Sequence, residues 1–115
     1  LTNAGQLAPY RITNGRVEAL SLPSFPLGAS PRYDFPTRPQ SVEPGDRLLF
    51  VTDGFVEATS AAGEPYGFDR FEALLRAEAG SDALRLRDAL LGAIETYTGG
   101  APPEDDRTLL ILTFE

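Results

Sequence analysis

The sequence contains no cysteine and no histidine among its 115 residues. The absence of cysteine excludes disulfides, thiolate zinc sites and cysteine-based phosphatase chemistry, and the absence of histidine excludes imidazole base catalysis and the usual zinc ligands. Any chemistry must therefore use carboxylates, hydroxyls, arginines or a metal ion held by oxygen ligands. Because hard cations prefer oxygen ligands, this composition points first to Mg²⁺ or Mn²⁺.

Lysine is also absent, so 10 arginines stand against 17 acidic residues and the formal net charge is −7. The chain has no basic stripe that could neutralise a phosphate backbone, and we expect no nucleic-acid partner. No apolar run approaches the roughly 20 residues of a membrane-spanning helix, so we expect no membrane partner and a cytoplasmic location. Because the chain starts at Leu1 and has no basic, apolar leader, we expect it to be cut from a longer protein.

The length and the 42% hydrophobic content predict a single globular unit with one core. In the first half, 7–13 and 16–20 have the pattern of strands. They are separated by Asn14-Gly15, the dipeptide best suited to a two-residue hairpin turn, because both positions tolerate a positive φ. The sequence therefore predicts a β-hairpin at the start of the chain.

Further along, an extended piece is predicted over 32–35. The turn 43–46, Glu-Pro-Gly-Asp, introduces an apolar strand over 48–52 that is predicted to be buried on both faces. The last predicted strand covers 108–114. All the strands apart from this one lie in the first half of the chain.

Between these strands the hydrophobic period changes to that of helices. Asp69 is placed to cap a first helix that Gly80 would end. Ser81 or Asp82 can cap a second helix, which Gly99-Gly100 stops. Strands, two helices and a returning strand make an α+β fold.

Two carboxylates mark the ends of the two most apolar strands. Asp53, followed by Gly54, comes directly after the first of them, and Asp105-Asp106 comes shortly before the second. If these strands are antiparallel neighbours, Asp53 and Asp105 meet at one rim of the sheet. Close carboxylates repel, and without histidine or lysine a divalent cation is the natural remedy. Gly54 would let the backbone pass close to such an ion.

Other interpretations of these residues stay open at this point. Asp-Gly is a common turn dipeptide, and Asp105-Asp106 could be a solvated loop that protects an aggregation-prone strand; from spacing alone this structural interpretation is preferred. Asp53 as a phosphate-accepting aspartate, as in response-regulator receivers, would need a lysine that the chain lacks. Arg47 and Arg107 could steer a phosphate, although arginines beside strands more often solvate a sheet edge or pair with acids.

Taken in order, five segments resemble the metal-dependent PPM-type protein phosphatases, specifically their sporulation protein IIE/RsbU branch. The likeness covers nearly the whole chain, and Gln6 is a departure, since the branch often has histidine there. The segments are Asn3-Ala4-Gly5-Gln6-Leu7-Ala8-Pro9, Pro26-Leu27-Gly28, Pro44-Gly45-Asp46 with Leu48-Leu49-Phe50-Val51-Thr52-Asp53-Gly54-Phe55-Val56-Glu57-Ala58, Gly63-Glu64-Pro65-Tyr66-Gly67, and Asp105-Asp106-Arg107-Thr108-Leu109-Leu110.

By this resemblance Asp53, beside Gly54, and Asp105 match metal-ligating aspartates, with Asp106 as a further candidate. The family uses two Mg²⁺ or Mn²⁺ ions and an activated water to hydrolyse phosphoserine or phosphothreonine without a phosphoenzyme. The implied function is that of a protein serine/threonine phosphatase. The implied substrate is a phosphorylated signalling protein, typically an anti-sigma-factor antagonist.

The resemblance also implies a fold and a place in it. The family's domain is an antiparallel β-sandwich flanked by helices, and residues 1–115 match its C-terminal half. Because other metal-binding aspartates of the family belong to the upstream half, we expect the isolated chain to bind metal weakly and to have little activity. Strands left unpaired could recruit a second copy and form a homodimer. The alternative functions are a non-catalytic regulatory or interaction module derived from this phosphatase, and an unrelated globular domain.

Overall fold

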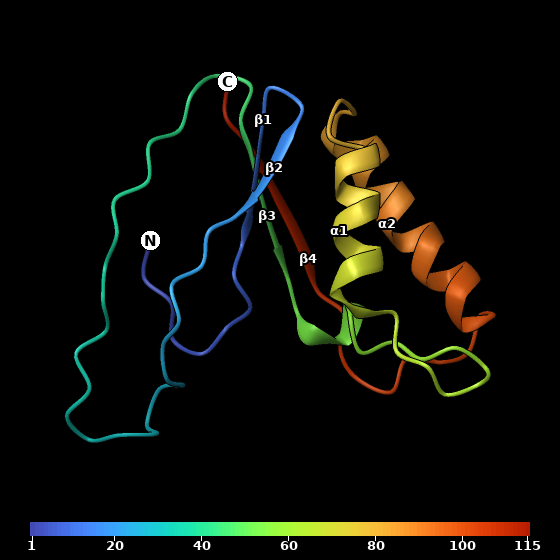
Figure 1. The fold of residues 1–115 in the computed structure, drawn as a ribbon, viewed down its shortest axis with the longest axis horizontal. Coiled ribbons are helices and arrows are strands. Elements are labelled where there is room, and N and C mark those ends of the chain that lie inside the picture. The colour runs from blue at the N-terminus through green and yellow to red at the C-terminus, as the bar shows by residue number, and fades with distance from the viewer.

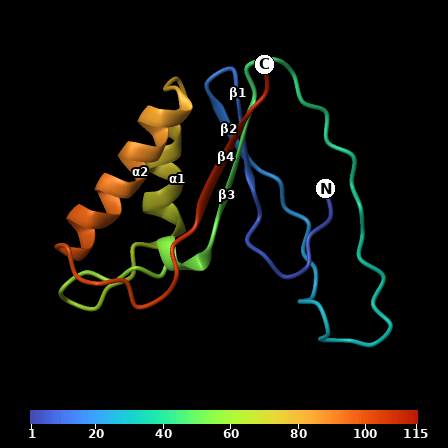
Figure 2. The ribbon, with the colours of Figure 1, turned by 180° about the vertical axis from the view of Figure 1, so that it is seen from behind.

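The computed structural model describes all residues of the chain, 1–115. A four-stranded antiparallel sheet is covered on one face by two helices, while the extended segments 1–9 and 20–46 run along the opposite side (Figures 1 and 2). The order of the strands in the sheet is β2-β1-β3-β4. The elements are β1 (Tyr10–Thr13), β2 (Arg16–Ala19), β3 (Arg47–Val51), the short 3₁₀ turn η1 (Asp53–Phe55), α1 (Gly67–Ala77), α2 (Ala83–Thr98) and β4 (Leu109–Thr113).

The predicted hairpin is confirmed. β1 pairs with β2, and the turn residues Asn14 and Gly15 have φ angles of 47° and 74°, as a two-residue turn of this kind requires. β1 is shorter than predicted and begins after Pro9, which has no backbone N–H to donate to a ladder. The strands β3 and β4 also fall within a residue of their predicted bounds.

The extended piece predicted over 32–35 forms no strand. Tyr33 instead packs between Phe25 and Phe35, with ring centroids 5.0 Å apart and the rings nearly perpendicular in both pairs. Pro31 and Pro36 bound this stretch and cannot donate ladder hydrogen bonds. Side-chain stacking therefore organises this segment.

The predicted start of the first helix was wrong. α1 begins at Gly67, whose backbone N–H donates to the carbonyl of Val56 at 2.9 Å, and no side chain caps it. Because a tertiary hydrogen bond satisfies the helix start, Asp69 lies inside the first turn instead of capping it. There its charge faces the positive end of the helix dipole. The helix ends at Ala77, before the predicted stop at Gly80.

Both ends of the second helix are as predicted. The Asp82 side chain accepts a hydrogen bond from the backbone N–H of Arg85 at 2.8 Å. At the other end Gly99 adopts the left-handed conformation with φ of 64°, which ends the helix. α2 packs against α1 and against β4.

The core lies between the sheet and the helices. Its fully buried side chains come from the sheet, the η1 turn and both helices: Ile12, Leu49, Phe55, Phe71, Leu75, Leu86 and Leu90. The other face of the sheet is different. There Leu110 and Leu112 of β4 are 50% and 41% exposed and lie opposite the half-buried Phe50 and Leu48 of β3. β3 is therefore not buried on both faces, because nothing in the chain covers this side near β4.

Arg47 is a buried residue that fastens the sheet to the helices. Its guanidinium donates to the backbone carbonyl of Ala79 at 2.5 Å and to that of Ser81. Both carbonyls belong to the connection between α1 and α2. Arg47 is thus engaged in structure and is not available to steer a phosphate.

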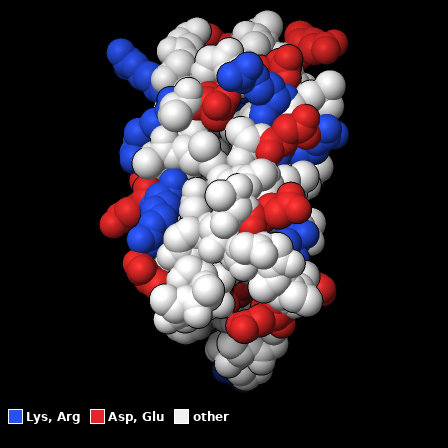
Figure 3. Space-filling model, turned by 90° about the vertical axis from the view of Figure 1, so that its right-hand side faces the viewer, with Lys and Arg blue, Asp and Glu red and all other residues white.

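The helical side of the surface carries acidic and basic side chains interspersed (Figure 3). Several form ion pairs, such as Arg70 with Glu64 at 2.8 Å and Arg76 with Glu72 at 2.7 Å. Neither helix is long and apolar enough to cross a membrane.

Candidate metal centre

The ends of β3 and β4 bring the two predicted aspartates together. The strands are antiparallel neighbours with Val51 opposite Leu109. The pairing continues one residue beyond β3, where the backbone N–H of Thr52 donates to the carbonyl of Thr108 at 3.1 Å. The chain that leaves β3 therefore runs beside the chain that enters β4, as the sequence predicted.

Thr52 fastens these two segments with its side chain. Its hydroxyl donates to the backbone carbonyl of Asp106 and accepts from the backbone N–H of Thr108, both at 2.9 Å. A hydroxyl is the one small side-chain group that can make both bonds at once. The residue before Asp53 thus holds the residues that follow Asp105.

After Thr52 the chain enters the η1 turn. The backbone carbonyl of Asp53 accepts hydrogen bonds from Val56 and Glu57, each at 2.9 Å. Phe55, inside this turn, is fully buried and packs against Phe71 with ring centroids 6.4 Å apart. Phe55 thus anchors the turn in the core, while Asp53 and Glu57 stay at the surface one helical turn apart and can lie side by side.

Three carboxylates form a cluster at this rim. Oxygen atoms of Asp53, Glu57 and Asp105 all lie within 4.8 Å of one another, and all three residues are exposed. None of them makes an ion pair with an arginine. Like charges at such distances repel, and an oxygen-only donor set of this kind suits a hard divalent cation. The residues present therefore fit Mg²⁺ or Mn²⁺.

Gly54 and Asp106 lie beside the cluster and contribute a backbone contact to it, not a carboxylate. A Cβ atom at position 54 would lie 2.4 Å from the backbone oxygen of Asp106, so only glycine allows the two segments to approach this closely. The Asp106 side chain is outside the cluster, and its backbone N–H donates to Oδ1 of Asp105 at 2.7 Å. In the structure both residues shape the approach of the two segments, and their part in metal binding stays a prediction.

The segment 3–6 closes on itself at the same end of β3. Asn3 accepts from the backbone N–H of Gln6 at 2.8 Å through Oδ1 and donates to its carbonyl at 2.7 Å through Nδ2. The amide of Gln6 reaches the carbonyl of Val51 at 3.4 Å. Gly5, with φ of 88°, sits so close to Pro26 that a Cβ would be 2.8 Å from it. The segments 3–9 and 26–28 therefore pack against each other beside the end of β3, which leads into Asp53.

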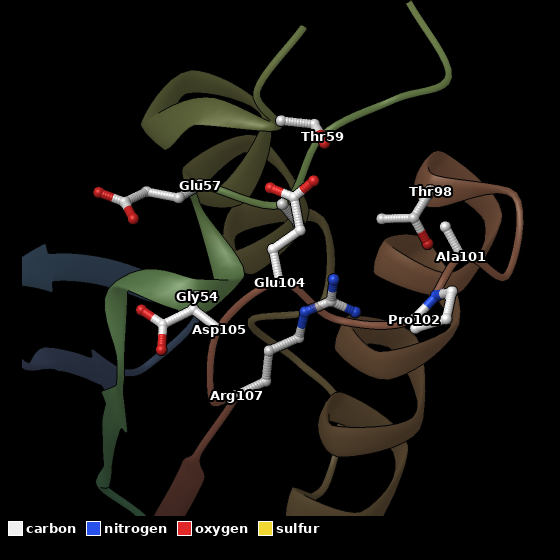
Figure 4. Close-up of a pocket in the computed structure, with 10 residues that line it drawn as sticks. Gly54, Glu57, Thr59, Thr98, Ala101, Pro102, Glu104, Asp105 and Arg107 are labelled. Atoms are coloured by element: carbon white, nitrogen blue, oxygen red, sulfur yellow. The ribbon is translucent and has the colours of Figure 1, made fainter. Parts of the chain in front are cut away.

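A pocket of about 180 Å³ adjoins the cluster (Figure 4). It lies between the η1 turn, the C-terminal end of α2 and the segment that leads into β4. Glu57 and Asp105 contribute to its wall, and so does Arg107. The complete lining consists of Gly54, Glu57, Ala58, Thr59, Thr98, Ala101, Pro102, Glu104, Asp105 and Arg107.

Glu57 is the member of the cluster that sequence reasoning missed. The available signal was its spacing of four residues from Asp53, which places two side chains on one face wherever the chain makes a helical turn. The turn after β3 is short, so it showed no helical hydrophobic period that could have revealed it.

Comparisons with known proteins identify solved structures with a similar fold. No curated protein matches the chain. Among solved structures, the SiaA-PP2C domain of Pseudomonas aeruginosa matches with a TM-score of 0.80 and 24% identity over 96% of this chain and 44% of that one. The RsbU and RsbW domains of a Mycobacterium tuberculosis protein match with a TM-score of 0.69 and 26% identity, over 97% of this chain and 31% of that chain. The PPM Ser-Thr phosphatase MsPP of Mycobacterium smegmatis, in complex with cacodylate, matches with a TM-score of 0.61 and 19% identity, over 99% of this chain and 55% of that chain.

The chain spans about half or less of the length of these structures. Its sheet and helix pair match part of the PP2C-like fold, in agreement with the predicted fragment of an antiparallel sandwich flanked by helices. The family described as stage II sporulation protein E (SpoIIE) matches residues 1–115. The chain therefore belongs to the SpoIIE family of PPM-type phosphatase domains.

Proposed function

We propose that this chain is the C-terminal part of a metal-dependent protein serine/threonine phosphatase. Its substrate would be a phosphorylated cytoplasmic signalling protein, such as an anti-sigma-factor antagonist. The observation that carries the proposal is the cluster of Asp53, Glu57 and Asp105 at one rim of the sheet, three carboxylates with no arginine partner. Membership of the SpoIIE family supports the assignment to phosphate-ester hydrolysis.

In this proposal Asp53 and Asp105 hold the metal and Glu57 adds a third carboxylate. When bound, Mg²⁺ or Mn²⁺ supplies a water of lowered pKa as nucleophile and offsets negative charge on the phosphoryl oxygens. Thr52 keeps Asp53 and Asp105 in register through its two hydrogen bonds. Gly54 permits the close approach of the two segments.

We also propose that residues 1–115 are the C-terminal half of a single phosphatase domain. The support is the sheet face away from the helices, where Leu110 and Leu112 are about half exposed beside Leu48 and Phe50. Apolar side chains on neighbouring strands are normally covered by a further layer. The rest of the domain would supply that layer, and a second copy of the chain is the alternative occupant.

Phosphate release tests the proposed activity. The full-length protein is incubated with a phosphoserine protein, with and without Mn²⁺ or Mg²⁺, and wild type is compared with Asp53→Asn. Asp34→Asn serves as the matched control, because Asp34 is exposed and belongs to the extended segment 20–46, which runs along the sheet side opposite the helices (Figure 1). We expect metal-dependent phosphate release by wild type and the control. In Asp53→Asn the rate of release should fall by about 100-fold or more. Residues 1–115 alone are expected to release little phosphate.

One outcome would contradict the proposed function. If the full-length protein binds the phosphoprotein but releases no phosphate with either metal, the chain is part of a non-catalytic regulatory module. Equal release by wild type and Asp53→Asn would instead remove Asp53 from the metal site.

A further inference from the structure

Arg107 is an arginine without a partner at the edge of the candidate metal centre. Its side chain is partly buried, and its Nε atom is fully buried without any hydrogen bond. No ion pair in the structure involves it. By contrast, the buried Arg47 donates to two backbone carbonyls. A buried donor without a partner is costly, and the guanidinium stands at the wall of the pocket with unused hydrogen-bonding capacity.

The aliphatic stem of Arg107 packs over Gly54. A Cβ at position 54 would lie 3.3 Å from Cγ of Arg107, so the arginine stem lies across the glycine that follows Asp53. From there the guanidinium points into the pocket of about 180 Å³, whose wall also includes Glu57 and Asp105 (Figure 4). The positive group is therefore placed beside the proposed reaction centre.

We propose that Arg107 binds an oxyanion of the phosphoprotein substrate next to the reacting phosphorus. The oxyanion is either a phosphoryl oxygen or a carboxylate that flanks the phosphorylated residue. A guanidinium suits both, because its planar fork of N–H donors matches phosphate and carboxylate groups. This inference rests on the proposed function, since the pocket also carries Glu57, Glu104 and Asp105, whose charge a divalent cation must offset before an anion can enter.

The space around Arg107 fits a peptide substrate. A second pocket of about 360 Å³ shares part of its lining with the first and is lined in part by Phe55, Leu91 and Ile94. Arg107 belongs to both pockets. A segment of chain that flanks the phosphorylated residue can therefore extend past the guanidinium into a more apolar hollow.

Steady-state kinetics and binding of the full-length protein test this role. Wild type, Arg107→Gln and Arg107→Lys are compared on a phosphoserine peptide, with Arg87→Gln as control because Arg87 is exposed and pairs only with Asp88. We expect Arg107→Gln to raise KM by about tenfold or more with a smaller change in kcat, and lysine to restore part of the loss. Anisotropy of a labelled phosphoserine peptide in the presence of Mn²⁺ should show the same weakening in Kd.

Two further measurements distinguish the sources of the oxyanion. If Arg107 binds phosphoryl oxygens, inhibition by inorganic phosphate weakens in Arg107→Gln by a factor similar to that for KM. If it binds a flanking carboxylate, phosphate inhibition stays unchanged, and only the preference for a peptide with glutamate over one with glutamine beside phosphoserine is lost. Either result supports the inference.

Unchanged KM, peptide Kd and phosphate inhibition in Arg107→Gln would overturn the inference. A lowered melting temperature with none of these changes would make Arg107 a structural counter-ion of the acidic cluster. These outcomes are separate from a failure of the proposed function, which appears as an inactive wild type. If wild type is inactive, the peptide Kd still tests the role of Arg107. Equal peptide binding by wild type and Arg107→Gln would show that Arg107 does not bind the oxyanion.

Discussion

The Cα atom of Gly54 lies against the backbone carbonyl oxygen of Asp106, at a separation that no side chain allows. A Cβ on Gly54 would be 2.4 Å from that oxygen. The contact joins the end of β3 to the start of β4 at the point where Asp53 and Asp105 meet. The glycine of the Asp-Gly pair is therefore required by the packing of two backbone segments.

Gly54→Ala is expected to destabilise the protein by about 1–3 kcal/mol, because the added methyl must push the Asp106 segment away. Urea unfolding of the full-length protein gives this free energy. Gly92→Ala is the matched control, since Gly92 lies within α2 and nothing is within 4 Å of its Cβ position. The control should be about 0.5–1 kcal/mol more stable than wild type. If Gly54→Ala leaves the free energy of unfolding unchanged, the backbone at Gly54 does not lie as close to the Asp106 carbonyl oxygen as the structure shows.

Thr52→Val is expected to cost about 1 kcal/mol of stability, because it removes one hydrogen bond to Asp106 and one from Thr108 while it keeps the side-chain shape. Thr52→Ser keeps the hydroxyl, so its free energy of unfolding should fall much less than that of Thr52→Val. The two variants are compared by the same unfolding measurement. If valine and serine behave alike, the hydroxyl does not fasten the strands.

The turn before β3 predicts a dependence of stability on pH. Hydrogen bonds from the Thr13 side chain and the Glu43 backbone hold the pKa of Asp46 below its ordinary value of 3.8. A depressed folded pKa means that the carboxylate stabilises the fold above the ordinary pKa, and that this contribution disappears as the pH falls through the folded pKa.

Asp46→Asn should therefore be less stable than wild type near neutral pH, and the difference should shrink as the pH falls below 3.8. Unfolding curves between about pH 7 and pH 2 measure it. Asp34→Asn, with an exposed carboxylate, gives the baseline. A difference that stays constant over this range would show that the ionised Asp46 carboxylate does not stabilise the turn.

Repulsion within the acidic cluster gives a prediction for the protein without metal. Asp105→Asn should melt at a temperature equal to or higher than wild type in the presence of a chelator at low salt, because it removes one of three charges that lie within 4.8 Å. The asparagine oxygen can still accept the backbone hydrogen bond of Asp106. Added salt should shrink the gain by screening. A lower melting temperature at low salt would mean that the three charges do not repel.

Several elements could be predicted because local chemistry decides them. Asn14-Gly15 set the hairpin, and Asp82 and Gly99 set the ends of α2, through backbone conformations and hydrogen bonds within a few residues. The meeting of Asp53 and Asp105 was also predictable, since it needed only two apolar strands to be antiparallel neighbours.

Other features depend on contacts between distant parts of the chain. α1 starts at Gly67 because its N–H finds the carbonyl of Val56, which no local pattern indicates. Arg47 is buried because carbonyls between the helices accept from it. Glu57 joins the cluster through a turn anchored by Phe55 in the core, so its role appears only when the packing is known.

A divalent cation bound at the rim between β3 and β4 can be detected directly in solution. Electron paramagnetic resonance of free Mn²⁺ during a titration of the full-length protein measures it without any need for turnover. We predict that wild type and Asp34→Asn bind Mn²⁺ alike, and that Asp53→Asn and Asp105→Asn bind at least about tenfold more weakly. Equal Mn²⁺ affinity in all four proteins would show that the rim between β3 and β4 is not a cation site.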